Sequence, residues 1–317
     1  MRVVLARTGD LLLLSYPAMI LLGILAALGT LAWRVRNRPL DRAALAGSLT
    51  SAVLVGWLGT RLVVVLLRGG LSGLSLGIFF PTRHSTTSFT IFALVASPIV
   101  LLDLWRRRLP ILAYLDAMAP SVLVLLALAK VGCLLAGCCA GSECPAGWWG
   151  MRYPYGSAPY IAQVANGTLR PPDALLRDDD DAHERLFGHV DFLRGVRHDP
   201  PEELTAHAAR HGMTYPEWVQ LAEGERSRPV WPVPLWYSLT AALIWIAAEV
   251  VYRRSVQPGW AMSVVLIGYA GMRLGFDPFV AKAGRTILGV PVTQAVAIVS
   301  LAVGIALAAR CWVKRPH

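Results

Sequence analysis

Charged residues are scarce in this sequence. They make up 16% of the 317 residues, whereas a soluble domain carries about 25%. The apolar residues follow no helical or strand period and instead form long blocks, which is typical of membrane spans rather than of a soluble core. The composition therefore excludes an ordinary soluble domain and predicts an all-α, polytopic transmembrane helical bundle.

A basic stripe is also missing, although the formal net charge is +10. The basic residues flank the apolar blocks, as they do in loops that leave a membrane. A nucleic-acid surface would instead gather them along one face. The charge placement therefore indicates the lipid bilayer as a partner and excludes nucleic acid.

Cysteine is rare and unevenly placed. Of the five cysteines, four lie between Cys133 and Cys144, and Cys311 stands alone. This distribution indicates local chemistry and excludes the disulfide framework of a small secreted fold.

The four clustered cysteines have the spacing C-x4-C-C-x4-C. This spacing matches no common zinc or iron–sulfur pattern, so we expect neither a metal nor another cofactor. We interpret Cys133 as a small residue that eases helix packing beside Gly132. In an oxidising compartment we expect a disulfide from Cys138 or Cys139 to Cys144.

Seven apolar blocks are each near the ~20 residues needed to cross a bilayer. The expected spans are Leu11–Trp33, Ala43–Leu67, Thr87–Trp105, Ile111–Cys139, Val233–Tyr252, Gly259–Phe276 and Val290–Arg310. The first block is too long for a signal-peptide core, and no clean cleavage site follows it. We therefore expect it to be retained as a span.

Clusters of basic residues follow every second span. They are Arg34, Arg36, Arg38 and Arg42, then Arg106, Arg107 and Arg108, then Arg253 and Arg254, and finally Arg310, Lys314 and Arg315. The alternate loops hold fewer basic residues. Because short cytoplasmic loops carry the excess of Lys and Arg, we expect the N-terminus outside the cytoplasm and the C-terminus inside.

Residues 140–230 are polar and rich in proline, and they separate two membrane parts, 1–139 and 231–317. Thr214 and Glu217 form the pattern of a capping box. We predict an extracytoplasmic insertion between spans four and five, with two or three short helices.

The same segment contains the acidic run Asp178–Asp181 and five histidines. These histidines are His183, His189, His198, His207 and His211. They lack tight ligand spacing, so we interpret them as solvated surface residues rather than as a metal site. We interpret the acidic run as a solvated loop.

Three cations, Arg61, Lys130 and Arg273, lie inside predicted spans. An ionisable residue within a membrane span is a functional-site hypothesis by default. At 1.5 Å per residue, all three lie roughly 20–30 Å above the inner boundary, in the outer half of the bilayer. Cations at one level repel each other unless an anion lies among them. The phosphate of an outer-leaflet lipid would fill this role.

A structural explanation of these cations stays open beside the functional one. Lys130 is close enough to the outer end of its span to reach the headgroups. Asp277 follows Arg273 by one helical turn and would neutralise it. Asp116 and Glu249 lie near the inner ends of their spans, where we expect structural carboxylates that are solvated or paired with the arginine clusters.

Four stretches match the motifs of one protein family. Residues 88–141 fit its central block without a gap, and K-V-G-C-L-L-A-G at 130–137 stands where the family reads G-R-x-G-N-F-x-N-G. Residues 57–62, W-L-G-T-R-L, are similar to F-L-G-G-R-I. Residues 267–273, I-G-Y-A-G-M-R, are similar to I-G-Y-G-A-F-R, and W-P-V-P-L-W at 231–236 is similar to H-P-S-Q-L-Y. On these stretches the chain resembles the bacterial prolipoprotein diacylglyceryl transferases.

The resemblance implies seven spans with an outside N-terminus, in a bacterial plasma (inner) membrane. It also implies a transferase that moves diacylglyceryl from phosphatidylglycerol to the thiol of a lipobox cysteine in a preprolipoprotein signal peptide. Glycerol phosphate leaves, basic residues bind the phosphate, and a histidine is implicated in catalysis. By position, Arg273 and Lys130 would be catalytic. The expected substrate-binding residues are Arg61, Tyr269, Asp277 and Thr90.

Several positions depart from the family pattern. The family's S-F-H-G-G is S-F-T-I-F here, so Thr90 stands at the histidine position. A threonine cannot act as a general base at neutral pH, and His84 is the nearest histidine and our candidate for that role. Lys130 replaces an arginine, Cys133 an asparagine and Cys138 an acid.

Two other functions stay open at this point. The chain would be a non-catalytic phospholipid-binding or transport protein on the same scaffold, which the replaced histidine favours. Alternatively, it would be a membrane thiol–disulfide protein that uses the cysteine cluster.

Overall fold

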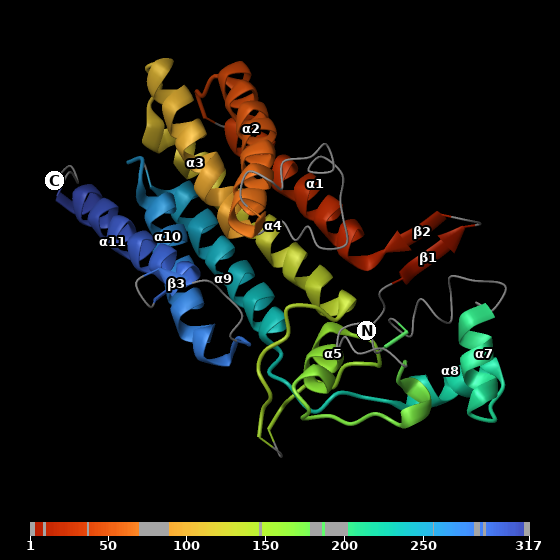
Figure 1. Cartoon of the computed structure of the whole chain (residues 1–317). Helices are drawn as coiled ribbons and strands as arrows, with labels where there is room; N and C mark the ends of the chain where they lie inside the picture. The colour runs from red at the N-terminus through yellow and green to blue at the C-terminus, as the bar shows by residue number, and fades with distance from the viewer. Residues whose placement is uncertain are drawn as a thin grey trace.

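The computed structural model describes residues 4–8, 11–36, 38–69, 89–145, 148–177, 186–187, 202–255, 257–281, 286–287 and 290–313. Within these ranges the chain is mostly helical (Figure 1). Each of the seven apolar blocks forms a long helix. These helices are α1 (Ser15–Arg36), α2 (Arg42–Gly69), α3 (Phe89–Arg106), α4 (Ile111–Ala136), α9 (Val233–Arg254), α10 (Trp260–Phe276) and α11 (Val292–Val313).

Five helices in the described part of the chain are long and apolar enough to cross a membrane. They are α1, α2, α4, α9 and α11. The other two long helices, α3 with 18 residues and α10 with 17, are the shortest of the seven. The structure thus supports a membrane protein with several spans.

Two short β-hairpins interrupt the helical pattern. Strand β1 (Val4–Thr8) pairs antiparallel with β2 (Leu11–Leu14), and β3 (Thr286–Ile287) pairs with β4 (Val290–Pro291). The first helix therefore begins at Ser15 and not at Leu11. A run of four apolar residues has no period that distinguishes a strand from a helix, and here the neighbouring strand satisfies its backbone.

The long helices form one bundle, in which α4 lies between α1 and α9, and α10 lies between α9 and α11 (Figure 1). Half of the α4 span is buried, more than in any other candidate span. A Cβ added at Gly23 of α1 would lie 2.9 Å from Leu125, so this glycine lets α1 and α4 approach closely. Helices α2 and α3 pack against each other beside this group.

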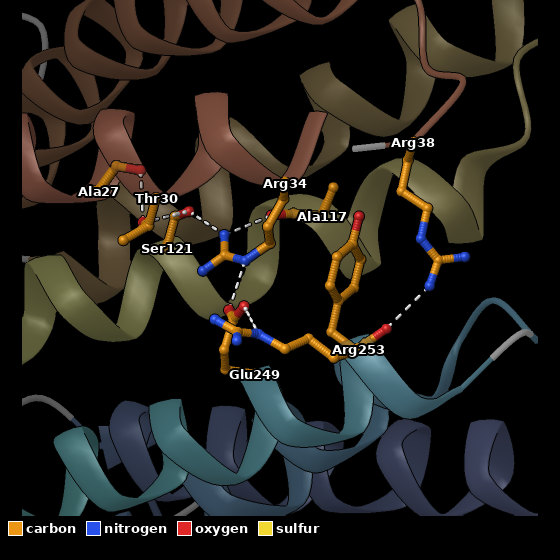
Figure 2. A network of polar contacts seen from close by, with 9 residues as sticks. Ala27, Thr30, Arg34, Arg38, Ala117, Ser121, Glu249 and Arg253 are labelled. Carbon is orange, nitrogen blue, oxygen red and sulfur yellow. Dashed lines mark hydrogen bonds and ion pairs between the residues drawn. The ribbon is translucent and has the colours of Figure 1, made fainter. Parts of the chain in front are cut away.

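A buried polar network joins α1, α4 and α9 (Figure 2). The Arg34 side chain is fully buried, and its Nε donates to Glu249 at 2.8 Å. Its Nη1 donates to the Ala117 carbonyl and to Ser121. Glu249 also accepts from Arg253 at 3.0 Å. The expected pairing of Glu249 with an arginine cluster is confirmed. The expectation that Arg34 lies in a loop is wrong, because Glu249, Ser121 and the Ala117 carbonyl bind its Nε and Nη1 inside the bundle. Its Nη2 is buried without a hydrogen-bond partner among the described residues.

Asp116 has a different structural role. Its carboxylate, 5% exposed, accepts the backbone N–H groups of Gly259 at 2.6 Å and Met262 at 2.7 Å. These amides begin α10 and have no partner within that helix. Asp116 therefore caps α10 from α4, which confirms a structural carboxylate, although its direct partners are amides rather than arginines.

The described residues between 140 and 230 form short elements with a core of their own. The elements are α5 (Ala158–Ala165), the 3-10 helix η3 (Asp173–Leu175), α7 (Glu202–Arg210) and α8 (Tyr215–Gly224). They lie at the end of the bundle where α4 ends and α9 begins, opposite the C-terminus (Figure 1). Isolated bridges pair Met151 with Val230 and Pro154 with Arg226. Three α-helices among the described residues agree with the two or three that we predicted.

The predicted capping box is present, and one of the five histidines is buried. Glu217 accepts the backbone N–H of Thr214 at 2.7 Å, which confirms the box. The surface interpretation is wrong for His207, which is 1% exposed. Its Nε2 lies 3.0 Å from the Ala174 carbonyl and its Nδ1 lies 3.3 Å from the Arg210 guanidinium, so both ring nitrogens have a partner. Its ring packs against that of Phe187 at a tilt. His211 is exposed. The remaining predicted features of this segment, His183, His189, His198 and the run Asp178–Asp181, lie outside the described residues.

Candidate functional site

Tyr237, on α9, brings two of the three predicted cations together. The Lys130 ammonium, from α4, lies 5.1 Å from the centre of the Tyr237 ring. Arg273, from α10, donates through Nη1 to the Tyr237 hydroxyl at 2.7 Å. One tyrosine therefore holds both cations, one by its ring face and the other by its phenol oxygen.

The Arg273 guanidinium is held by further contacts. Its Nη2 donates to the Thr293 hydroxyl on α11 at 2.7 Å. The same nitrogen lies 3.6 Å from Asp277, an ion-pair distance that is too long for a hydrogen bond. Asp277 also accepts a hydrogen bond from Gln294. Among the described residues, Nε of Arg273 is buried and has no hydrogen-bond partner.

The charge around Tyr237 is unbalanced within the described residues. Lys130 and Arg273 contribute two positive charges, and Asp277 contributes one negative charge. Aromatic rings surround this group, with Phe276 5.4 Å from Tyr237 and Trp236 5.6 Å from Phe276. An excess cation in apolar surroundings is costly without an anion. The arrangement is therefore suited to bind one.

Arg61 does not join this group. It lies on α2, with its Cζ 5.8 Å from the ring of Trp57 on the same helix. Its Nε is buried and has no hydrogen-bond partner among the described residues. Depth along a helix does not determine lateral neighbours, and α2 packs mainly on α3. The structure therefore brings together two of the three cations.

The other predicted site residues lie in different settings. Tyr269, half-buried, is one helical turn before Arg273 and packs in the same apolar cluster as Tyr237. Thr90 belongs to the first turn of α3, but its side chain lies outside the described residues. His84 also lies outside them. Roles for these residues stay predictions.

A cluster of three thiols lies next to the cationic group, and the sequence did not predict it. Helix α4 ends at Ala136 rather than at Cys139, because Gly137 adopts the left-handed conformation with φ 68°. The chain turns back, and the Cys138 N–H bonds to the Cys133 carbonyl at 3.0 Å. The Sγ atoms of Cys133, Cys138 and Cys139 all lie within 4.8 Å of one another. The glycine after the last helical residue was the available signal.

The predicted disulfide to Cys144 is wrong. All five cysteines are free. Cys144 is buried, and its N–H bonds to the Pro229 carbonyl at 3.0 Å, while Cys138 and Cys139 turn toward Cys133. The packing interpretation of Cys133 agrees with its 5% exposure, but its thiol also faces the other two.

The pKa of one buried tyrosine is affected by the three crowded thiols. Burial, together with the charges of the three cysteines, raises the pKa of Tyr153 to about 12. The pKa of Tyr153 thus reflects both its burial and the presence of the thiols.

Two comparisons with known proteins bear on this site. The model of the family described as prolipoprotein diacylglyceryl transferase matches residues 3–310. A curated relative from Rhodopirellula baltica, named phosphatidylglycerol–prolipoprotein diacylglyceryl transferase, is 38% identical over 69 residues. That alignment covers 22% of this chain and only 14% of the relative.

Proposed function

Because the chain belongs to the prolipoprotein diacylglyceryl transferase family, we propose that it is an inner-membrane transferase of lipoprotein biosynthesis. It moves diacylglyceryl from phosphatidylglycerol to the thiol of a lipobox cysteine. The observation that carries this proposal is the meeting of Lys130 and Arg273 at Tyr237. Two cations from separate helices leave one positive charge uncompensated in an apolar setting.

The phosphate of the lipid would bind between these two cations. The unpartnered Nε–H of Arg273 and the Lys130 ammonium are the available donors. Hydrogen bonds between ionised partners are about twice as strong as neutral ones. As the bond from glycerol carbon to phosphate oxygen breaks, negative charge grows on the leaving glycerol phosphate. Cations that are already fixed in place stabilise that charge without reorganising.

Supporting roles follow for the remaining predicted residues. Asp277 orients Arg273, and Tyr269 packs beside the lipid phosphate site. Arg61 and Thr90, on the α2–α3 pair, contact the lipid away from its phosphate. His84 receives the thiol proton. The assignments of Asp277, Tyr269, Arg61 and Thr90 rest on their positions in the family motifs. The assignment of His84 rests on its being the histidine nearest to Thr90 in the sequence.

We also propose the full topology. All seven long helices cross the bilayer, with the N-terminus outside and the C-terminus in the cytoplasm. Residues 140–230 form an extracytoplasmic insertion between the membrane parts 1–139 and 231–317. The arrangement of the described elements supports this proposal, because α5, α7 and α8 lie at the opposite end of the bundle from the C-terminus (Figure 1).

The test is direct transfer by the purified full chain. The protein in phosphatidylglycerol vesicles is mixed with a lipobox peptide, and glycerol phosphate release and peptide mass are followed. We expect release that requires the peptide and a peptide heavier by one diacylglyceryl group. Phosphatidylglycerol binding without release would instead identify a non-catalytic lipid-binding protein. Absence of both would overturn the proposal.

A further inference from the structure

We propose that Cys133, Cys138 and Cys139 bind one zinc ion as thiolates and leave its fourth coordination position open. The three Sγ atoms lie within 4.8 Å of one another. In a tetrahedral site with Zn–S bonds of about 2.3 Å, the sulfur atoms lie about 3.8 Å apart. The thiols therefore need only a small inward movement to bind the ion.

The backbone already holds the three ligands in place. Gly137 reverses the chain, and the Cys138 N–H is bonded to the Cys133 carbonyl. Cys139 has a φ of 56°, a conformation that residues with a side chain rarely adopt. The turn thus brings Cys138 and Cys139 back toward Cys133, which lies on α4. Because the ligands are preorganised, little ordering remains to oppose metal binding.

A buried tyrosine beside this turn has a hydroxyl without a hydrogen-bond partner among the described residues. Tyr153 is fully buried, and its hydroxyl has no hydrogen-bond partner among the described residues. The ring lies against the turn, since a Cβ added at Gly137 would be 3.3 Å from it. A buried hydroxyl normally finds a partner. A ligand on the fourth position of the zinc ion, water in the resting protein, supplies one.

The surrounding charge is consistent with this site. Three thiolates and one Zn²⁺ carry a net charge of −1, and Lys130 lies one helical turn before Cys133. The ammonium balances this charge on one side and contacts Tyr237 on the other. Lys130 therefore belongs both to the surroundings of the zinc site and to the cationic group at Tyr237.

The open coordination position of the zinc ion suits the thiol of the lipobox cysteine. This assignment rests on the proposed function. A thiol that coordinated zinc would lose its proton to water, and this would take the place of proton transfer to His84. The bound thiolate of the lipobox cysteine would then form a bond from sulfur to the glycerol carbon. The bond from that carbon to the phosphate oxygen breaks, and glycerol phosphate leaves with the electron pair. Zinc would thus activate the acceptor in a chain in which Thr90 stands at the position of the family's histidine.

Metal content tests the site independently of activity. The full chain is purified from membranes without chelator and analysed by mass spectrometry of its metals. We expect about one zinc per chain, and about a tenth of that after Cys138→Ser combined with Cys139→Ser. Cobalt substitution should give thiolate-to-cobalt absorption bands in the wild type alone. Cys311→Ser is the matched control, because this cysteine is buried far along α11 and should leave the zinc in place.

Three results would overturn the zinc site. They are metal-free protein with three free thiols, copper in place of zinc, and a disulfide between any two of the three cysteines. The role in transfer has a separate outcome. Transfer that continues at the same rate after zinc removal would refute acceptor activation, while zinc-loaded wild type without transfer would refute the proposed function and leave the metal site standing.

Discussion

The guanidinium of Arg273 is fixed at two nitrogens and unpartnered at the third among the described residues. Arg273→Ala removes a charge-assisted donor worth about 1.5–3 kcal/mol at a phosphate. We expect phosphatidylglycerol affinity to fall roughly tenfold to hundredfold. Arg273→Lys should restore only part of it, because the fork is lost. Lipid binding by the folded variants in vesicles measures both effects.

A purely structural role for Arg273 predicts a different result. If the residue only neutralises Asp277, then Arg273→Ala and Asp277→Ala would both lose folded protein, and lipid binding by whatever folds would be unchanged. Arg254→Ala, an exposed cation at the other end of the bundle, is the control for general loss of charge. Wild-type affinity of well-folded Arg273→Ala protein would end the phosphate-site interpretation.

Two substitutions at Tyr237 separate its contact with Arg273 from its contact with Lys130. Tyr237→Phe removes the hydroxyl that accepts from Arg273 but keeps the ring beside Lys130. Tyr237→Leu removes both contacts. We expect a loss of about 1 kcal/mol in lipid binding for Phe and a further loss of about 0.5–1 kcal/mol for Leu. Equal losses in a titration with phosphatidylglycerol vesicles would show that the ring does not position Lys130.

At the scale of residues, the sequence predicted which charged residues form the site better than it predicted the residues that contact them. Lys130 and Arg273 stood out because cations are rare inside apolar blocks. Tyr237 did not, since a tyrosine near the end of a span is common. Arg61 shared their predicted depth but not their neighbours. The thiol cluster was missed because C-x4-C-C is a poor ligand spacing on a straight helix, and only the turn at Gly137 makes it a good one.

At the scale of elements, the short helices around α8 share a core, and one substitution within it tests that core. Trp218 is fully buried, and its Nε1 donates to the Ala174 carbonyl at 2.6 Å. Trp218→Ala should destabilise this core by about 3–5 kcal/mol. Trp149→Ala changes the same residue type at a position that is 92% exposed and should cost little. Limited proteolysis should therefore cut the Trp218→Ala chain faster between 140 and 230, and equal rates would contradict the assigned core.

Helix positions followed from the sequence more closely than helix ends did. All seven apolar blocks form helices, because an apolar run in lipid must satisfy its backbone internally. The differences lie at the ends, where local contacts decide. The strand Leu11–Leu14 delays the start of α1, and Gly137 stops α4 before Cys138. Burial of Arg34 also escaped prediction, because its partners Ser121 and Glu249 are distant in the sequence.

At the scale of the whole molecule, the two ends of the bundle differ. Arg34, Glu249 and Arg253 are linked where α1 and α9 end. The short helices of residues 140–230 lie at the opposite end. Since basic residues stay on the cytoplasmic side, we expect these two ends to set the orientation of all the long helices together.

Epitope insertion tests that orientation in the intact chain. Epitopes placed after Arg36, after Arg107 and after Arg254 should be hidden from antibody in spheroplasts and exposed only when the membrane is opened. An epitope at Gly212, in the exposed turn between α7 and α8, should bind antibody on intact spheroplasts. This turn has open space around it, so the insertion should not disturb the fold. A hidden epitope at Gly212, or an accessible one after Arg107, would overturn the seven-span topology. Such a result would place the Lys130–Arg273 site in the inner leaflet, because both residues lie near the same end of the bundle as the 140–230 segment.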